Sequence, residues 1–184
     1  MVNTLMTVNG VKPLINGVLF QAVWFACLLG GNLWALVATT LYLLVHHYYF
    51  MRDRTEWRLL AVFVLLGVIL DGALFDFGVF SANQDMFWMR GLPPAWLLCL
   101  WLCVGTLFAH SLAFLRGRYW LSAGMGAIGP TLSYYTGAKI ADISLAEPIW
   151  QSLMAVALIW SLVVPFGVYL VEKWRLFEAR DRRL

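Results

Sequence analysis

Long apolar stretches alternate with short polar segments along the whole chain, and this pattern predicts helices rather than strands. The apolar stretches cover residues 13–29, 33–50, 57–80, 94–115, 119–137 and 148–170. Each is close to the roughly 20 residues that an α-helix needs to cross the hydrocarbon core of a bilayer. We therefore predict an all-α fold, a six-helix transmembrane bundle formed by a single integral-membrane domain over residues 1–184.

The polar segments between these stretches predict where the helices end. Gly30–Asn32 predicts a tight turn after the first helix, and the charged segments Arg52–Arg54 and Arg116–Arg118 follow the second and the fourth. The longest loop covers residues 81–94. Gly129–Pro130 lies inside the fifth stretch, where proline removes a backbone donor, and predicts that this helix is interrupted.

The distribution of basic residues predicts how the helices are oriented. With the N-terminus in the cytoplasm, the cytoplasmic segments hold all but two of the 13 Lys and Arg residues: Lys12, Arg52, Arg54, Arg58, Arg116, Arg118, Lys173, Arg175, Arg180, Arg182 and Arg183. The opposite side holds Arg90 and Lys139. Because Lys and Arg accumulate in cytoplasmic loops, we expect both termini in the cytoplasm. A five-helix alternative would leave the basic C-terminal segment on the outer side and fits this rule less well.

Composition agrees with a membrane protein. The chain is 62% hydrophobic and 12% charged, whereas soluble domains are about 45–50% apolar and about 25% charged. The many Trp, Tyr and Phe residues suit the bilayer interface. The net charge of +3 is explained by the cytoplasmic segments. We therefore expect the lipid bilayer as the partner, and no nucleic acid.

The clearest candidate for chemistry is Asp71, which lies inside the third apolar stretch. A carboxyl at the centre of a membrane helix costs roughly 2.5–3.5 kcal/mol to insert, so it normally faces the protein interior or a water cavity. Ser133 and Tyr134, in the fifth stretch, lie at a similar predicted depth. We therefore predict a polar, substrate-binding site around these three residues. In the alternative interpretation, a neutral Asp71 only joins two helices through hydrogen bonds.

Two amides in the first stretch, Asn16 and Gln21, also need polar partners in lipid. We expect both to face the bundle, where they either contact a substrate or join helices. The fifth stretch carries small residues four positions apart, Ser122 with Gly126 and Ala123 with Ala127. This spacing allows helix backbones to approach closely, so we predict that this helix packs in the centre of the bundle.

The three histidines, His46, His47 and His110, all lie at the predicted cytoplasmic level. Two histidines on facing helices can ligate a metal or haem. The adjacent His46 and His47 point about 100° apart, so at most one of them faces a given site. Interfacial histidines are usually solvated or hydrogen-bonded, so we predict no metal and no cofactor. We expect the cysteines to pack as small apolar residues without disulfides: Cys27, Cys99 and Cys103.

Several segments together carry a family resemblance: Asn16–Gln21, Trp24–Cys27, Leu70–Gly72, Pro94–Leu97, His110–Leu112 and Gly129–Gly137. In this order the chain resembles an uncharacterised family of small multi-pass inner-membrane proteins of Gram-negative bacteria, domain of unknown function 2878. The resemblance covers nearly the whole chain. It implies a location in the bacterial inner (plasma) membrane, and the family's association with lipid-modifying enzymes points to lipids. It supplies no activity.

Three kinds of function fit these observations. The first is a transporter or lipid-handling carrier with a polar site near Asp71, which the buried carboxyl and the glycine–proline pair favour. The second is a membrane-embedded lipid-modifying enzyme, for which the sequence offers no recognisable nucleophile, metal site or acid–base pair. The third is a non-catalytic subunit of a membrane complex, with other membrane proteins as partners. The sequence thus leaves open whether the chain is an enzyme, and it identifies no catalytic residue.

Overall fold

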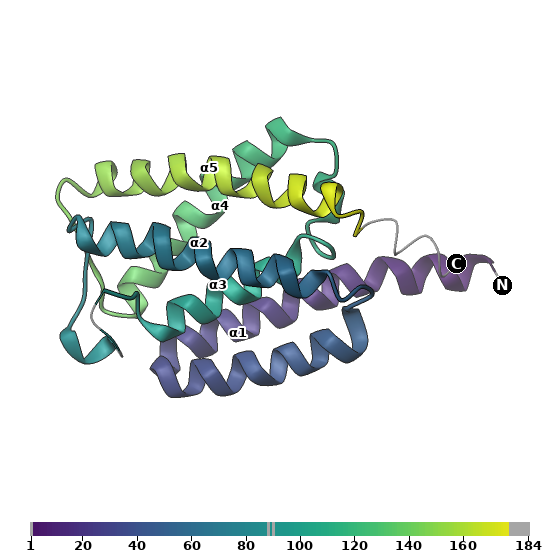
Figure 1. Ribbon diagram of the computed structural model, residues 1–184, viewed down its shortest axis with the longest axis horizontal. Helices are drawn as coiled ribbons and strands as arrows, with labels where there is room; N and C mark the ends of the chain where they lie inside the picture. The colour runs from purple at the N-terminus through teal and green to yellow at the C-terminus, as the bar shows by residue number, and fades with distance from the viewer. Residues whose placement is uncertain (1, 88, 90, 177–184) are drawn as a thin grey trace.

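The computed structural model describes residues 2–87, 89 and 91–176. Arg90, Arg180, Arg182 and Arg183, which contribute to the predicted orientation, lie outside the described residues. The described chain is helical almost throughout and has five α-helices (Figure 1): α1 (Val2–Val45), α2 (Glu56–Asp76), α3 (Ala95–Leu107), α4 (Tyr119–Ile140) and α5 (Ile149–Lys173). The shorter elements are a π-helix, two 3-10 helices and two strands: η1 (His46–Phe50), η2 (Gln84–Met86), η3 (Ala113–Leu115), β1 (Phe80–Ser81) and β2 (Ser144–Leu145).

Helix α1 is bent into two limbs that run back along each other (Figure 1). The bend lies at Gly31, with φ 65° and ψ −164°, a conformation that glycine adopts readily and other residues avoid. Asn32 holds the bend in place, because its side chain donates to the Met86 carbonyl (3.0 Å) and accepts from the Trp96 amide (3.1 Å). The predicted turn at Gly30–Asn32 is confirmed. The described α-helices number five rather than six because α1 contains the first two apolar stretches.

Two other helices differ from the prediction. Helix α3 ends at Leu107, and the rest of the stretch predicted to reach residue 115 forms turns and η3. Helix α4 continues through Pro130, so the predicted interruption is wrong. Next to the proline, the Thr131 hydroxyl donates to the Ala127 carbonyl at 2.7 Å. Membrane helices tolerate proline because neighbouring helices, side chains and local adjustments of the helix satisfy the freed backbone groups.

Several helices have the length and composition of membrane-spanning helices. Three segments of the described chain are long and apolar enough to cross a bilayer: Val11–Phe50, α2 and α5. The surface is also apolar, since Leu29, Trp120 and Leu162 are 74%, 93% and 73% exposed. Apolar exposure on this scale suits a lipid environment rather than water.

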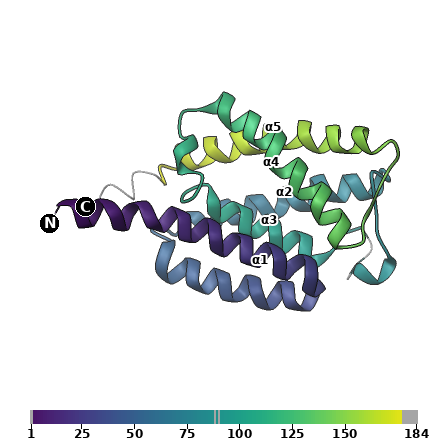
Figure 2. The same cartoon turned by 180° about the vertical axis from the view of Figure 1, so that it is seen from behind.

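Helix α3 packs between α1 and α2, whereas α4 crosses α5 obliquely (Figure 2). The two helices of this second pair approach closely at Gly126, where a Cβ atom would lie 2.2 Å from the Trp160 carbonyl oxygen. Ser122, one turn earlier, is buried. The predicted close approach is confirmed, with α5 as the partner, but α4 is not central in the bundle, because its buried residues are few: Ser122, Gly126, Gly137 and Ala138.

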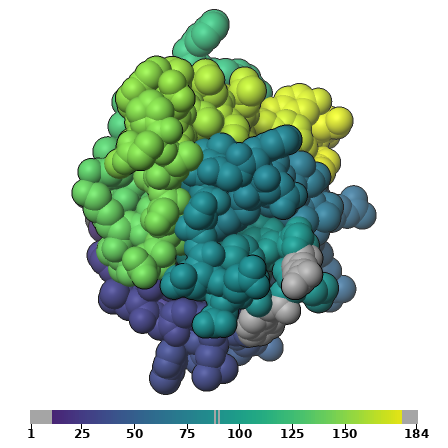
Figure 3. Space-filling model, turned by 90° about the vertical axis from the view of Figure 1, so that its left-hand side faces the viewer, coloured from purple at the N-terminus to yellow at the C-terminus, as the bar shows by residue number. Residues whose placement is uncertain are grey.

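At one end of the molecule, a short antiparallel ladder joins two loops. Phe80 of β1 pairs with Leu145 of β2, and the Ala146 amide donates to the Val79 carbonyl at 2.9 Å. The ladder ties the chain that follows α2 to the chain that follows α4. Figure 3 looks onto this end, where the two parts of the chain lie side by side. We call this ladder the β1–β2 strap.

Candidate functional site: a buried carboxyl beside an apolar cavity

Asp71 lies in α2 and is 1% exposed. Its carboxylate accepts a hydrogen bond from the Trp101 indole N–H in α3 (2.6 Å). It also accepts from the Tyr134 hydroxyl in α4, which lies 2.8 Å and 3.0 Å from the two carboxylate oxygens. The structure therefore brings Asp71 and Tyr134 together, as their predicted depths suggested. Both donors are neutral, and a substrate-binding role for the group stays a prediction.

Aromatic packing holds the two donors in position. Trp101 stacks on Trp160 of α5, with ring centroids 4.6 Å apart and planes at 23°. Tyr134 stacks on Phe80, with centroids 5.7 Å apart and planes at 27°. The Trp101 indole also covers Gly67, where a Cβ atom would lie 2.5 Å from the ring. Four helices and the β1–β2 strap thus converge on one carboxyl group.

A cavity of about 570 Å³ lies in front of this group, between α1, α3, α4 and α5. This volume is within the usual range for small-molecule sites, about 300–1,000 Å³. Most of the lining is apolar, including Phe20, Leu100, Val104, Phe108 and Met125. Trp101 and Tyr134 form part of the wall, so Asp71 lies behind them. The wall also contains other polar groups: Gln21, Trp24, Ser133 and Thr136.

Ser133 and Gln21, which were also predicted to bind substrate, do not hydrogen-bond to Asp71. Ser133 is in the cavity wall, where its hydroxyl oxygen accepts from the Trp24 indole at 2.9 Å rather than contacting Asp71. Gln21 also lines the cavity, but it is exposed and does not face the bundle interior as expected.

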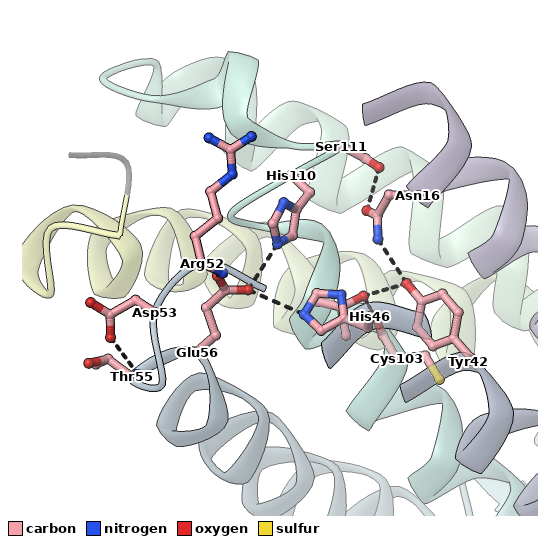
Figure 4. Close-up of polar contacts among 11 residues, drawn as sticks. Asn16, Tyr42, His46, Arg52, Asp53, Thr55, Glu56, Cys103, His110 and Ser111 are labelled. Carbon is pink, nitrogen blue, oxygen red and sulfur yellow. Dashed lines mark hydrogen bonds and ion pairs between the residues drawn. The ribbon is translucent and has the colours of Figure 1, made fainter. Parts of the chain in front are cut away.

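Asn16 belongs to a separate polar network (Figure 4). Its amide donates to the Tyr42 hydroxyl (3.0 Å) and its carbonyl oxygen accepts from Ser111 (2.6 Å). Tyr42 in turn bonds Thr106 at 2.6 Å, and Thr106 donates to the Cys103 carbonyl at 2.7 Å. Asn16 is fully buried in this network. The network joins both limbs of α1 to α3 and to the turn after it, which is the helix-joining role considered for this residue.

A second cluster of ionisable groups lies where η1, the first turn of α2 and the turn after α3 meet (Figure 4). One Glu56 carboxylate oxygen lies 3.2 Å from the His46 Nε2 atom and 2.9 Å from the His110 Nε2 atom. The other oxygen accepts from the Arg52 backbone amide at 3.0 Å. The His46 Nδ1 atom is buried, and it has no hydrogen-bond partner among the residues that the structure describes. His47 lies apart and is exposed.

These three side chains are a possible metal-ligand group among the residues that the structure describes, with one ligand atom of each within 4.8 Å of the others. The three cysteines are free and buried. Sequence reasoning had placed His46 and His110 at one level, and the structure confirms that they meet. Glu56 was not predicted from the sequence, because it directly follows a charged turn and resembles a surface residue. Trp101, whose indole N–H lies within an otherwise apolar helix, was not predicted either.

Comparison with known proteins gives a family but no function. The family model described as "Protein of unknown function (DUF2878)" matches residues 13–166. No curated protein and no solved structure matches the chain. The matched segment begins in the first limb of α1, ends in α5 and includes both polar clusters. The chain therefore belongs to the DUF2878 family of proteins of unknown function.

Proposed function

We propose that this protein is a multi-pass membrane protein that binds and carries a lipid-like molecule in the cavity between α1, α3, α4 and α5. The observation that supports this most directly is the combination in one cavity of a largely apolar lining with polar groups next to Asp71. Ligand sites in proteins commonly combine apolar walls with a few positioned polar groups. The proposal makes this protein a carrier rather than an enzyme or a passive subunit.

The position of the cavity favours a ligand that comes from the bilayer. Phe25 of α1 and Leu132 of α4 both line it and are 46% and 61% exposed. The cavity wall is thus continuous with the apolar outer surface. A molecule entering from the lipid would place its chain along Leu100 and Val104. Its polar end would meet the hydroxyl groups of Ser133 and Tyr134.

The proposal includes six membrane crossings: the two limbs of α1, then α2, then α3 together with the turns and η3 that follow it, then α4 and α5. Both termini are cytoplasmic, and the membrane is the bacterial inner membrane. Support comes from the three long apolar segments, the bend at Gly31 and the basic residues near one set of helix ends. The polar network of Asn16 and the cluster around Glu56 would then lie towards the cytoplasm.

Topology is measurable with single cysteines added to a variant that lacks the three native ones. A membrane-impermeant thiol reagent is expected to label cysteine at Ala82 and Asp142 in intact cells, and to label cysteine at Arg54 and Gly117 only after lysis. The basic residues flanking the latter positions favour the cytoplasm. Labelling of position 117 in intact cells would contradict the proposed crossings.

Filling the cavity should block lipid binding. We expect Gly129→Leu to reduce labelling of the purified protein by a photoreactive acyl lipid at least tenfold, because Gly129 lies in the cavity wall and its Cβ direction is open. Gly124→Leu is the matched control, since Gly124 is on the same helix with an equally open Cβ direction but does not line the cavity. Equal labelling of both variants and the wild type would rule out this cavity as the lipid site.

A further inference from the structure

We propose that His46, Glu56 and His110 bind one divalent transition-metal ion, with Zn²⁺ as the best fit. The three side chains come from separate elements and point at one another (Figure 4). No part of the lipid-carrier proposal uses them. The site would lie at the end of the molecule away from the β1–β2 strap.

The spacing of the donor atoms is close to that of a metal site. Around a tetrahedral Zn²⁺ with bonds of about 2.0–2.1 Å, neighbouring ligand atoms lie roughly 3.3 Å apart. The Glu56 oxygen lies 2.9 Å and 3.2 Å from the two histidine nitrogens, and all three ligand atoms fall within 4.8 Å. Rotation of the imidazole rings would be needed to direct all three donors at one ion.

The donor set selects the class of metal. Two imidazole nitrogens and one carboxylate oxygen suit Zn²⁺, Fe²⁺ or Mn²⁺, whereas Ca²⁺ and Mg²⁺ prefer oxygen ligands. The side chains of His46, Glu56 and His110 are 0%, 5% and 11% exposed, so little water competes for them. The carboxylate is ionised when it ligates, and its charge offsets half that of the ion.

The surroundings hold the carboxylate in place. The Arg52 amide donates to the Glu56 oxygen that faces away from the histidines, which is the kind of contact that orients a metal ligand. Asp53 accepts from the Thr55 amide at 2.7 Å and shapes the turn that presents Glu56. His46 opens a π-helical turn, a rare geometry that occurs frequently at functional sites.

A position for a fourth ligand is also present. A small cavity of about 20 Å³ adjoins Glu56 and His110, which is room for one water molecule. Three protein ligands and one water form the usual coordination of a reactive zinc ion. An ion bound there would be accessible to a small ligand through this cavity and would not only join helices.

The alternative is an ion-free cluster in which both imidazoles donate to the same Glu56 oxygen. The two arrangements differ in whether the protein retains a metal. We would strip the purified full-length protein with a chelator and titrate it with Co²⁺, whose visible absorption reports ligation, and then add Zn²⁺ as competitor. We expect about one Co²⁺ per chain, displaced by Zn²⁺.

Substitutions at Glu56 and His110 test whether the metal binds to these side chains. Glu56→Gln and His110→Ala are expected to weaken Co²⁺ binding at least tenfold, whereas His47→Ala, which changes an exposed neighbour, should bind like the wild type. Absence of Co²⁺ and Zn²⁺ binding by the wild type, or unchanged binding in folded His110→Ala, would overturn the proposal. Thermal unfolding of the wild type tests the site even if a variant fails to fold. Zn²⁺ should raise its melting temperature reversibly, and no rise would equally overturn the site.

Discussion

Gly126→Val is expected to separate α4 from α5 and to cause the largest loss of stability of any single change considered for this protein. A Cβ atom at Gly126 would lie 2.2 Å from the Trp160 carbonyl oxygen, and a backbone atom cannot rotate away as a side chain can. Overpacking usually costs about 1–3 kcal/mol, and this contact is with backbone, so we expect about 3 kcal/mol. The measurement is thermal unfolding of the purified protein in detergent.

Gly124→Val is the control for that experiment. It places the same β-branched side chain in the same helix, where its Cβ has no atom within 4 Å. It therefore carries the same propensity penalty without the steric conflict. If both variants unfolded at the same temperature, the close approach of α4 and α5 would not be a source of stability. Because Trp160 stacks on Trp101, Gly126→Val should also lower lipid labelling.

The second large effect is expected at Asp71. Asp71→Leu removes the acceptor shared by the buried Trp101 indole N–H and the partly buried Tyr134 hydroxyl. An unsatisfied buried group costs about 1–3 kcal/mol, although hydrogen bonds between membrane helices average only about 0.6 kcal/mol. We expect a total loss of about 2 kcal/mol, measured as a lower melting temperature.

Asp71→Asn separates hydrogen bonding from the carboxyl's other properties. Asparagine keeps one acceptor oxygen, so this variant should melt between Asp71→Leu and the wild type. In cells, the lipid profile of a deletion strain should be restored by the wild type and not by Asp71→Leu. Full restoration by both variants would exclude Asp71 from the proposed function, whatever their melting temperatures.

Sequence patterns predicted the features that depend on local chemistry. Apolar stretches located the helices, and Gly31 located the bend, because few other residues adopt its backbone conformation. Matching residues by their predicted depth in the membrane also correctly paired Tyr134 with Asp71. The rule works because a buried carboxyl must find polar partners at its own level. Extending it to indole N–H groups would have found Trp101 as well.

The predictions that were wrong or missing concern features that depend on tertiary contacts. Pro130 was expected to interrupt its helix, but α4 continues through it, with Thr131 bonded to a neighbouring carbonyl. Gln21 was expected to face the bundle interior, but it is exposed in the wall of the cavity. Glu56 gave no signal, because an acidic residue in the first turn of a helix is favourable on its own. Only the fold shows that two histidines reach it.

If the cavity binds a ligand as proposed, the β1–β2 strap would limit how that ligand exchanges. At this end the strap fixes α4 to the chain that follows α2, and at the other end Glu172 of α5 accepts from the Gly117 amide just before α4 begins (2.7 Å). With both ends of α4 fastened, α4 would not swing away from its neighbours to open an exit at either end. Exchange would instead run sideways into one leaflet, between α1 and α4. The Trp24–Ser133 hydrogen bond joins α1 to α4, so it would have to break each time a molecule passes between these helices.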